Sequence, residues 1–165
     1  MAGRYWLVKS EPGAYSIEDL KRDRRTVWDG VRNFQARNFL RDQMKAGDLV
    51  FFYHSNAEPS GIAGVAQVVR AGYPDPSAFD PKDKHYDPKS KRGNPSWFVV
   101  DIEFVKKFEE LIPLETLRGA KGLEQMPLLE RGQRLSVQPV SPQEWAVITG
   151  LARRSKKKTV PAGLA

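Results

Sequence analysis

The chain has 165 residues, of which 40% are apolar and 28% are charged, a balance typical of one globular domain with a single hydrophobic core. It contains no cysteine, which excludes disulfides, thiol nucleophiles and zinc sites of the cysteine type. It also lacks a long uncharged apolar run, and Arg4 and Lys9 interrupt the N-terminus, so we expect a cytoplasmic protein without a membrane span or signal peptide.

The net charge of +7 is concentrated at one end of the sequence. Five of the 27 basic residues lie between residues 151 and 165, where there are no acidic residues, which leaves 22 basic against 20 acidic residues in the rest of the chain. We therefore expect a basic, disordered tail over residues 153–165. Such a tail either keeps the protein in solution or attracts phosphate groups in a salt-sensitive way. The charge alone does not identify the partner.

In chain order, residues 4–9 come first and are apolar and aromatic enough for a strand. Ser16 then begins a capping box, which predicts a short helix over 17–22. Residues 26–28 form a second short extended piece that ends at Asp29 and Gly30. These elements are short, and each is followed by turn residues.

Asn33 is placed to cap a longer helix that reaches about residue 45. One face of that helix is apolar at every fourth residue, at Ala36, Leu40 and Met44. Gly47 ends it, since glycine accepts a left-handed backbone at little cost. The strongly apolar residues 49–54 follow as a strand.

The second half of the chain predicts three further strands, over residues 62–70, 97–108 and 134–140. Residues 73–96 separate the first two; they carry five prolines and many charges and show no period, so we expect a functional or disordered loop. Short helices are predicted at 113–117 and 126–129. Ser141, Pro142 and Glu144 give a strong start for a last helix. Short strands separated by turns favour an α+β fold with a small, partly closed β-barrel and helices packed around it.

No motif for catalysis, metal binding or a cofactor is present. There is no P-loop, dinucleotide-binding glycine pattern or nucleophile elbow, and His54 and His85 do not have the spacing of metal ligands. We therefore expect no catalytic residues, metal or cofactor. His54 at a strand end is more typical of a structural hydrogen bond than of a general base. An RNA-binding or RNA- or nucleotide-processing enzyme that uses His54 and Lys9 is the alternative. A protein-interaction module is a third hypothesis.

Six segments are distinctive in this order: YWLVKSEP, VWDGVRNFQARNFLR, FFYHSN, GIAG, HYDPKSKRGNPSW and RLSVQPVSPQEW. Together they closely resemble the EVE-domain family over about residues 3–150, so the expected domain spans residues 1–152. The resemblance implies a PUA-like fold related to the YTH readers of methylated adenine. Some family members are understood to bind DNA with modified cytosines, and no catalytic activity is established for the family. It therefore implies a non-catalytic reader, with DNA favoured over RNA as the partner.

Resemblance to YTH domains also implies a base-binding pocket. Trp28 and Trp97 would form its aromatic walls, and Lys9 and Ser10 would contact the edge of the base. Glu11 and Pro12 replace the asparagine-containing stretch of YTH readers, so adenine is not the implied base. Further candidates for hydrogen bonds to the base are Asp29, Asn33, Tyr53, His54 and Ser55.

Several of these residues also have a purely structural interpretation. Asn33 could cap its helix, and Asp29 could hold a turn through its own side chain. Trp6 and Trp145 lie inside elements and are expected in the core. Phosphate contacts are expected from basic residues near the cage: Arg32, Arg37, Arg41, Lys89, Lys91 and Arg92. The alternative for each is a solvated surface charge. We expect a monomer that acts in the cytoplasm, with nucleoid or nuclear association left open.

Overall fold

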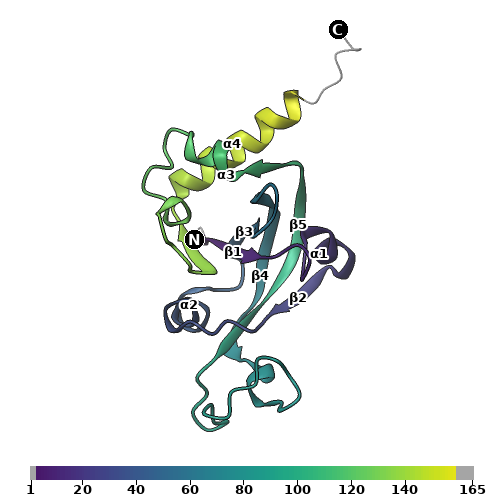
Figure 1. Ribbon diagram of the computed structural model, residues 1–165, viewed down its shortest axis with the longest axis vertical. Helices are drawn as coiled ribbons and strands as arrows, with labels where there is room; N and C mark the ends of the chain where they lie inside the picture. Colours follow the sequence, from purple (N-terminus) through teal and green to yellow (C-terminus); the bar gives the residue numbers. More distant parts are fainter. Residues whose placement is uncertain (1–2, 159–165) are drawn as a thin grey trace.

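Six strands form one mixed sheet in the computed structural model, which describes residues 3–158 (Figure 1). The order across the sheet is β2-β5-β4-β3-β1-β6; β1 and β3 pair in parallel, and the other neighbouring pairs are antiparallel. The strands are β1 (Tyr5–Ser10), β2 (Arg25–Trp28), β3 (Leu49–His54), β4 (Gly61–Pro74), β5 (Phe98–Pro113) and β6 (Val137–Val140). The α-helices are α1 (Ile17–Asp23), α2 (Phe34–Asn38), α3 (Leu114–Arg118) and α4 (Pro142–Lys158). Three shorter helices are the π-helix η1 (Phe39–Gln43) and the 3-10 helices η2 (Pro76–Phe79) and η3 (Pro127–Leu129).

Both faces of the sheet are covered, which explains why β3 is apolar from Leu49 to Tyr53. Successive side chains of a strand point to opposite faces. Along β3, Val50 and Phe52 belong to one buried cluster, while Phe51 and Tyr53 belong to the other. A strand buried on both faces is a continuous apolar run and does not alternate.

The first face is covered by α1, α2 and η1. Helix α1 begins with the predicted capping box: Ser16 Oγ accepts from the Asp19 N–H at 3.1 Å, and the Asp19 carboxylate accepts from the Ser16 N–H at 2.9 Å. Its buried residues Ile17 and Leu20 join the first cluster. The predicted apolar face of the second helix is also buried there, with Ala36, Leu40 and Met44 each 0% exposed.

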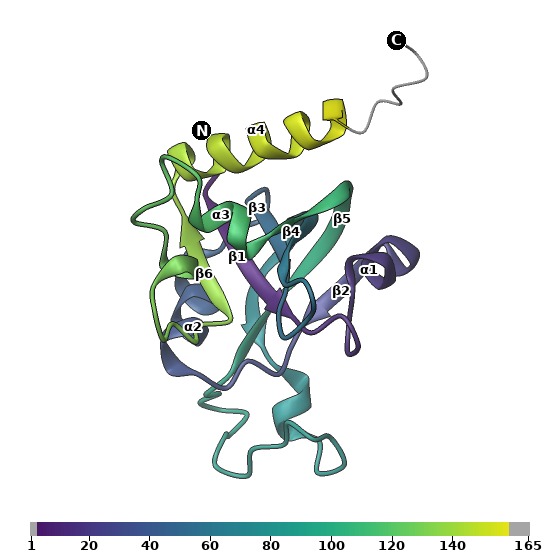
Figure 2. The same ribbon diagram turned by 45° about the horizontal axis from the view of Figure 1, so that its top comes forward.

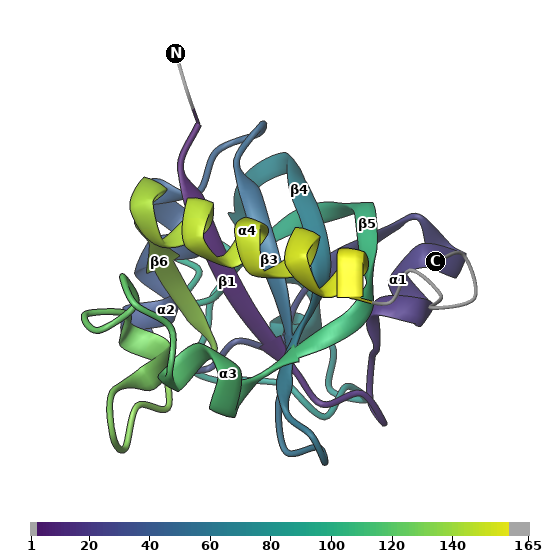
Figure 3. The same cartoon turned by 90° about the horizontal axis from the view of Figure 1, so that it is seen from above.

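The second face is covered by α3 and α4. Helix α4 lies across this side of the sheet (Figures 2 and 3). Trp145 stacks on Phe51, with ring centroids 3.8 Å apart, and on Tyr5, with centroids 4.6 Å apart. Ser141 and Glu144 form the predicted helix start, because the N–H of each is bound by the side chain of the other. The expected core positions of Trp6 and Trp145 are confirmed, as Trp6 is 1% exposed and Trp145 packs against the second cluster.

Strands β4 and β5 extend beyond the sheet as a long antiparallel pair with four register shifts. The segment between them, residues 75–97, forms a projection at one end of the molecule (Figure 1). The sequence shows no period here because side-chain turns stabilise the segment: Asp75, Asp80, Asp83 and Asp87 each accept a hydrogen bond from the N–H two residues further on. It is therefore a structured loop.

The expected α+β class is confirmed, but the sheet is not closed into a barrel, since it ends in β2 on one side and in β6 on the other. The expected tail differs at its start, because α4 continues to Lys158 and includes residues 153–158. Residues 159–165 lie outside the described residues, and the domain boundary at residue 152 stays a prediction. Within residues 3–158, no helix combines the length and apolar character that crossing a bilayer requires.

Candidate nucleic-acid interface

An open cleft of about 810 Å³ lies where β1 and β2 end. Its walls come from β1 with the turn after it, from β2 with the loop before α2, and from the segment between β4 and β5. We call it the Trp28 cleft; it is lined by residues 9–11, 14–15, 26–32, 82–85 and 136. Its volume falls within the range of about 300–1,000 Å³ that small-molecule sites occupy.

Aromatic rings from three segments border this cleft. Trp28, the last residue of β2, is 9% exposed and meets the edge of the Phe52 ring, with centroids 5.5 Å apart. The Phe52 contact therefore fixes the indole at the wall of the cleft. Tyr15 and His85 also line the cleft. Aromatic rings are the side chains on which a planar heterocycle can stack.

Asp75 fastens the β4–β5 segment to the wall that carries Trp28. Its carboxylate is fully buried and accepts from the Gly30 N–H at 3.0 Å, from Arg32 Nη1 at 2.9 Å and from the Ser77 N–H and Oγ at 2.8 and 2.7 Å. Burial raises the pKa of Asp75, but the hydrogen bonds from Ser77, Gly30 and Arg32 outweigh burial and hold the pKa below its ordinary value. An ionised carboxylate thus links two distant segments.

Gly30 is required at the next contact. Its φ is +77°, and a Cβ there would lie 2.5, 2.6 and 2.9 Å from three imidazole atoms of His85. The His85 carbonyl also accepts from Arg32 Nη2 at 2.7 Å. The backbone of Gly30, in the turn after Trp28, therefore packs directly against the imidazole ring of His85 in the β4–β5 segment. A side chain at residue 30 would displace that ring.

Charged groups of both signs face the Trp28 cleft. Asp29 keeps more than a third of its surface exposed; partial burial raises its pKa, and the nearby charges of Asp75 and Asp83 raise it further against the opposing effect of His85. Burial lowers the pKa of Lys9, which precedes the last residue of β1 and lines the same cleft. The cleft therefore offers a carboxylate acceptor and a partly buried ammonium donor, and groups of these two kinds can hydrogen-bond to a base edge. Across residues 3–158, no three His, Asp or Glu side chains gather where they could hold a metal ion.

Residues 4–151 match the family model of the EVE domain, which is nearly the whole range expected from the sequence. The chain belongs to the EVE domain family. Human thymocyte nuclear protein 1 is 44% identical over 169 residues, covering 91% of this chain and 74% of the human protein. An X-ray structure of a Pseudomonas putida protein is 49% identical with a TM-score of 0.87, covering 90% of this chain and 99% of that chain. A crystal structure of human THYN1 protein in complex with DNA containing 5-methylcytosine is 44% identical with a TM-score of 0.83, covering 91% of this chain and 98% of that chain.

The two tryptophans predicted to form a cage in this EVE domain do not line one cleft. Trp28 lines the Trp28 cleft, whereas Trp97 does not. The Trp97 ring is 7% exposed and stacks on Phe34 with centroids 4.7 Å apart, and its Nε1 donates to Asp87 at 2.6 Å. Arg32 lies over the ring, with Cζ 5.2 Å from its centroid. Trp97 is therefore packed among protein groups beside the cleft. The predicted pocket with Trp28 and Trp97 as its two aromatic walls has no support from these contacts.

The base-edge candidates divide between the cleft and the scaffold. Lys9, Ser10 and Asp29 line the Trp28 cleft, although the Ser10 hydroxyl already donates to the Tyr15 carbonyl at 2.6 Å. Asn33 caps α2 through a bond from the Ala36 N–H at 3.0 Å, which is the structural alternative for that residue.

The three candidates at the end of β3 lie elsewhere. Tyr53 and Ser55 line a second cleft of about 660 Å³, which shares Lys9 with the first. His54 lines neither cleft; it is 8% exposed, and its Nε2 accepts from the Ile17 N–H at 3.1 Å. Burial lowers the pKa of His54, with Lys107 acting in the same direction and Glu18 opposing. His54 is thus a buried imidazole that accepts from the first N–H of α1, and its pairing with Lys9 in the enzyme alternative stays a prediction.

The predicted phosphate ligands are likewise in different settings. Arg32 is held by Asp75 and the His85 carbonyl, and its contact with a phosphate stays a prediction. Arg37 and Arg41 remain at the surface of the helix pair that follows, where Arg41 pairs with Asp42. The other three predicted ligands are exposed on the β4–β5 segment and do not line the Trp28 cleft: Lys89, Lys91 and Arg92.

Reasoning from the sequence missed the two rings other than Trp28 that line the cleft, those of Tyr15 and His85. The exposed residues Lys82 and Lys84 also line it, at its rim. The signal for His85 was the glycine after Trp28-Asp29, because a glycine in a turn marks a close approach of another group. Which group approaches depended on the fold.

Proposed function

We propose that this EVE domain binds nucleic acid that carries a modified base, with modified cytosine in DNA favoured over RNA, and holds that base in the Trp28 cleft. The observation that carries the proposal is the open Trp28 cleft with Trp28 at its wall and Asp29 and Lys9 at its edge. Support comes from the human relative, whose crystal structure contains DNA with 5-methylcytosine. The relatives' name refers to the nucleus, so the expected cytoplasmic location has no support from them.

Stacking on Trp28 supplies the affinity for a base of any kind. One base on one aromatic ring contributes about 1–3 kcal/mol. Extrusion of a base from a duplex costs a few kcal/mol, so this contact must be joined by others at the base edge. Tyr15, which borders the same cleft, is the second ring in our proposal.

Asp29 supplies the preference for cytosine. The exocyclic N4 amino group of cytosine is a donor, and a carboxylate is its natural acceptor. Lys9, near the end of β1, carries a positive charge. Its ammonium group donates a hydrogen bond to an acceptor on the base or on the adjacent phosphate. A 5-methyl group adds about 0.8 kcal/mol when buried, so methylation alone gives discrimination of only a few-fold.

The chemistry in this proposal is recognition and not turnover. The geometry of His54 supports that choice, because its Nε2 is engaged by the Ile17 N–H and its ring lies outside both clefts. The proposed partner is therefore released unchanged.

The test is equilibrium binding to oligonucleotides with plain, methylated and oxidised cytosine, single- and double-stranded, at one salt concentration, because phosphate contacts make affinity strongly salt-dependent. We expect tighter binding to the modified strands and a loss of that binding in Trp28→Leu and Asp29→Ala. Glu115→Gln, an exposed carboxylate of α3 that lines neither cleft, is the matched control. Equal affinity of the folded protein for every oligonucleotide contradicts the proposal.

A further inference from the structure

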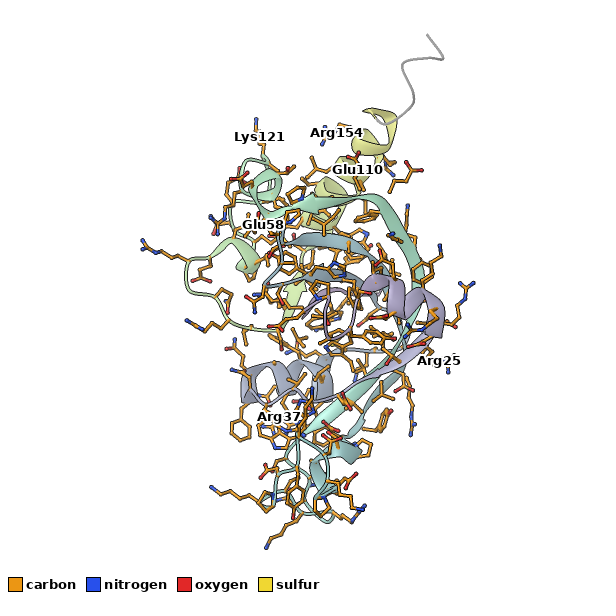
Figure 4. All side chains as sticks on the ribbon, turned by 45° about the vertical axis from the view of Figure 1, so that its right-hand side comes forward. Arg25, Arg37, Glu58, Glu110, Lys121 and Arg154 are labelled. Carbon is orange, nitrogen blue, oxygen red and sulfur yellow. The ribbon has the colours of Figure 1, made fainter. Side chains whose placement is uncertain are left out.

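Four side chains form a continuous stack beside the Trp28 cleft. Arg32 lies over one side of the Trp97 ring at 5.2 Å, Phe34 stacks on that ring at 4.7 Å, and Arg37 lies over Phe34 at 4.9 Å. Figure 4 shows Arg37 on α2, close to the base of the β4–β5 projection. Because Arg32 also lines the Trp28 cleft, the stack begins at the cleft and runs outward from it.

Phe34 is the exposed member of this stack. Its residue surface is 60% exposed, more than that of any other large hydrophobic residue in the described part of the chain; the next are Val105 at 46%, Tyr86 at 41% and Val27 at 40%. Trp97 and Arg37 both contact the Phe34 ring, but these contacts leave more than half of the residue surface in water. A single exposed apolar side chain is common on protein surfaces, and Phe34 differs from such a residue because its ring is stacked on a packed tryptophan and lies beside an arginine.

The ring of Phe34 is held in place before any partner arrives. It is the first residue of α2, directly after the Asn33 cap. The packed Trp97 ring supports it from one side. A rigid apolar group loses little conformational freedom when it inserts into a partner.

The surface around Phe34 suits a polyanion. Arg37 donates through Nη1 to the Ser96 carbonyl at 2.6 Å and through Nε to Asn38 at 2.8 Å; within the described residues, its Nη2 has no hydrogen-bond acceptor. Arg41 lies near enough to lower the pKa of Arg37, after the larger effect of burial. A positioned guanidinium with a remaining donor is a natural contact for a phosphate oxygen.

We propose that Phe34 is a wedge that enters a nucleic-acid duplex at the step left open when the modified base moves into the Trp28 cleft, while Arg37 contacts the neighbouring phosphate. This inference rests on the proposed function, because a wedge is needed only when a base has left the stack. Apolar side chains that insert between base steps are a recurrent device of DNA-binding proteins, and phenylalanine is among them. The inserted ring replaces part of the stacking that the extruded base gives up.

The test compares a duplex with the corresponding single strand, each carrying one 5-methylcytosine. In the wild-type protein and in Phe34→Ala, Phe34→Trp and Val105→Ala, dissociation constants are measured by fluorescence anisotropy at one salt concentration. We expect Phe34→Ala to weaken duplex binding about 5- to 150-fold, the range of one base–ring stack, and to change single-strand binding by less than about threefold. Phe34→Trp retains a ring and restores duplex binding. Val105→Ala removes a comparably exposed apolar side chain from β5 and has no effect.

Failure of the wedge differs from failure of the proposed function. If Phe34→Ala binds the duplex as tightly as the wild type does, or loses the same factor on both substrates, the wedge is wrong while base recognition stands. If the wild-type protein itself binds neither substrate, the proposed function fails, and the wedge fails with it. Circular dichroism of each variant confirms that the fold is unchanged, which is expected because residue 34 is at the surface.

Discussion

Removal of the Asp75 carboxylate should destabilise the protein and open the Trp28 cleft. Asp75→Ala deletes the acceptor of four hydrogen bonds and leaves the Arg32 guanidinium, whose side chain is 23% exposed, without its charged partner. Removing one member of a buried ion pair costs about 3–5 kcal/mol, and because Arg32 keeps some contact with water we expect a loss of about 3 kcal/mol. With a urea dependence of about 2 kcal/mol per M, the unfolding midpoint should fall by about 1.5 M.

The measurement is urea unfolding followed by tryptophan fluorescence, with the slope compared between variants. The matched control is Asp42→Ala, which breaks another Arg–Asp pair, with Arg41, at an exposed place where the side chains are 38% and 50% exposed; its midpoint should not move. A shift for Asp75→Ala that is no larger than the shift for Asp42→Ala refutes the structural argument, because it means that the buried pair does not hold the β4–β5 segment on the cleft.

Three further predictions follow from the cleft and its support. Gly30→Ala should lose about 1–2 kcal/mol of stability and weaken nucleic-acid binding, because φ is +77° and the new Cβ would displace His85; unfolding and binding curves together check this. Burial lowers the pKa of His54 below 6.5 in the folded protein, so on acidification the unfolded chain takes up a proton at this residue before the folded protein does. The contribution of His54 to stability is therefore complete above pH 6.5 and is lost as the pH falls through the lowered pKa of the folded protein. His54→Gln should flatten the fall in unfolding free energy between pH 7 and pH 5, and an unchanged slope would contradict the assignment. Because the pKa of Asp29 is raised, its carboxylate takes up a proton at a higher pH than an ordinary aspartate does. The affinity for cytosine-containing strands should therefore decrease as the pH is lowered in the wild type, and it should not do so in Asp29→Asn.

Local patterns were enough to predict most elements and their ends. The capping boxes at Ser16 and Ser141 place the starts of α1 and α4 correctly, because they involve only neighbouring backbone groups. The apolar period of Ala36, Leu40 and Met44 identifies the buried side of α2 and η1 for the same reason. Part of the cleft lining was also accessible: resemblance to a family implied Lys9, Ser10 and Trp28, Asp29 was a further hydrogen-bond candidate, and all four line the cleft. Their contacts with a base stay a prediction.

Trp97 and His85 show where this reasoning stopped. A tryptophan beside a proline-rich loop has the same sequence appearance whether it faces a ligand or a phenylalanine, and its stack on Phe34 depends on how the β4–β5 segment folds back. Asp75 and Gly30 are 45 residues apart in the sequence, so no local sequence pattern predicts their hydrogen bond. Sequence-based reasoning could foresee neither the stack of Trp97 on Phe34 nor the approach of His85 to Gly30, because long-range packing decides both.

The amino-acid sequence by itself determined the family, through the resemblance of its distinctive segments. It also determined the α+β class, the helix starts and the apolar runs of β1 and β3, because these depend on short-range periodicity, capping and composition. Only the tertiary structure decided that the sheet stays open, that His54 caps α1, and that Asp75 joins two distant segments into one cleft. The physical reason is that a buried carboxylate or imidazole is satisfied by whichever donors the fold brings to it, and those donors lie far away along the chain.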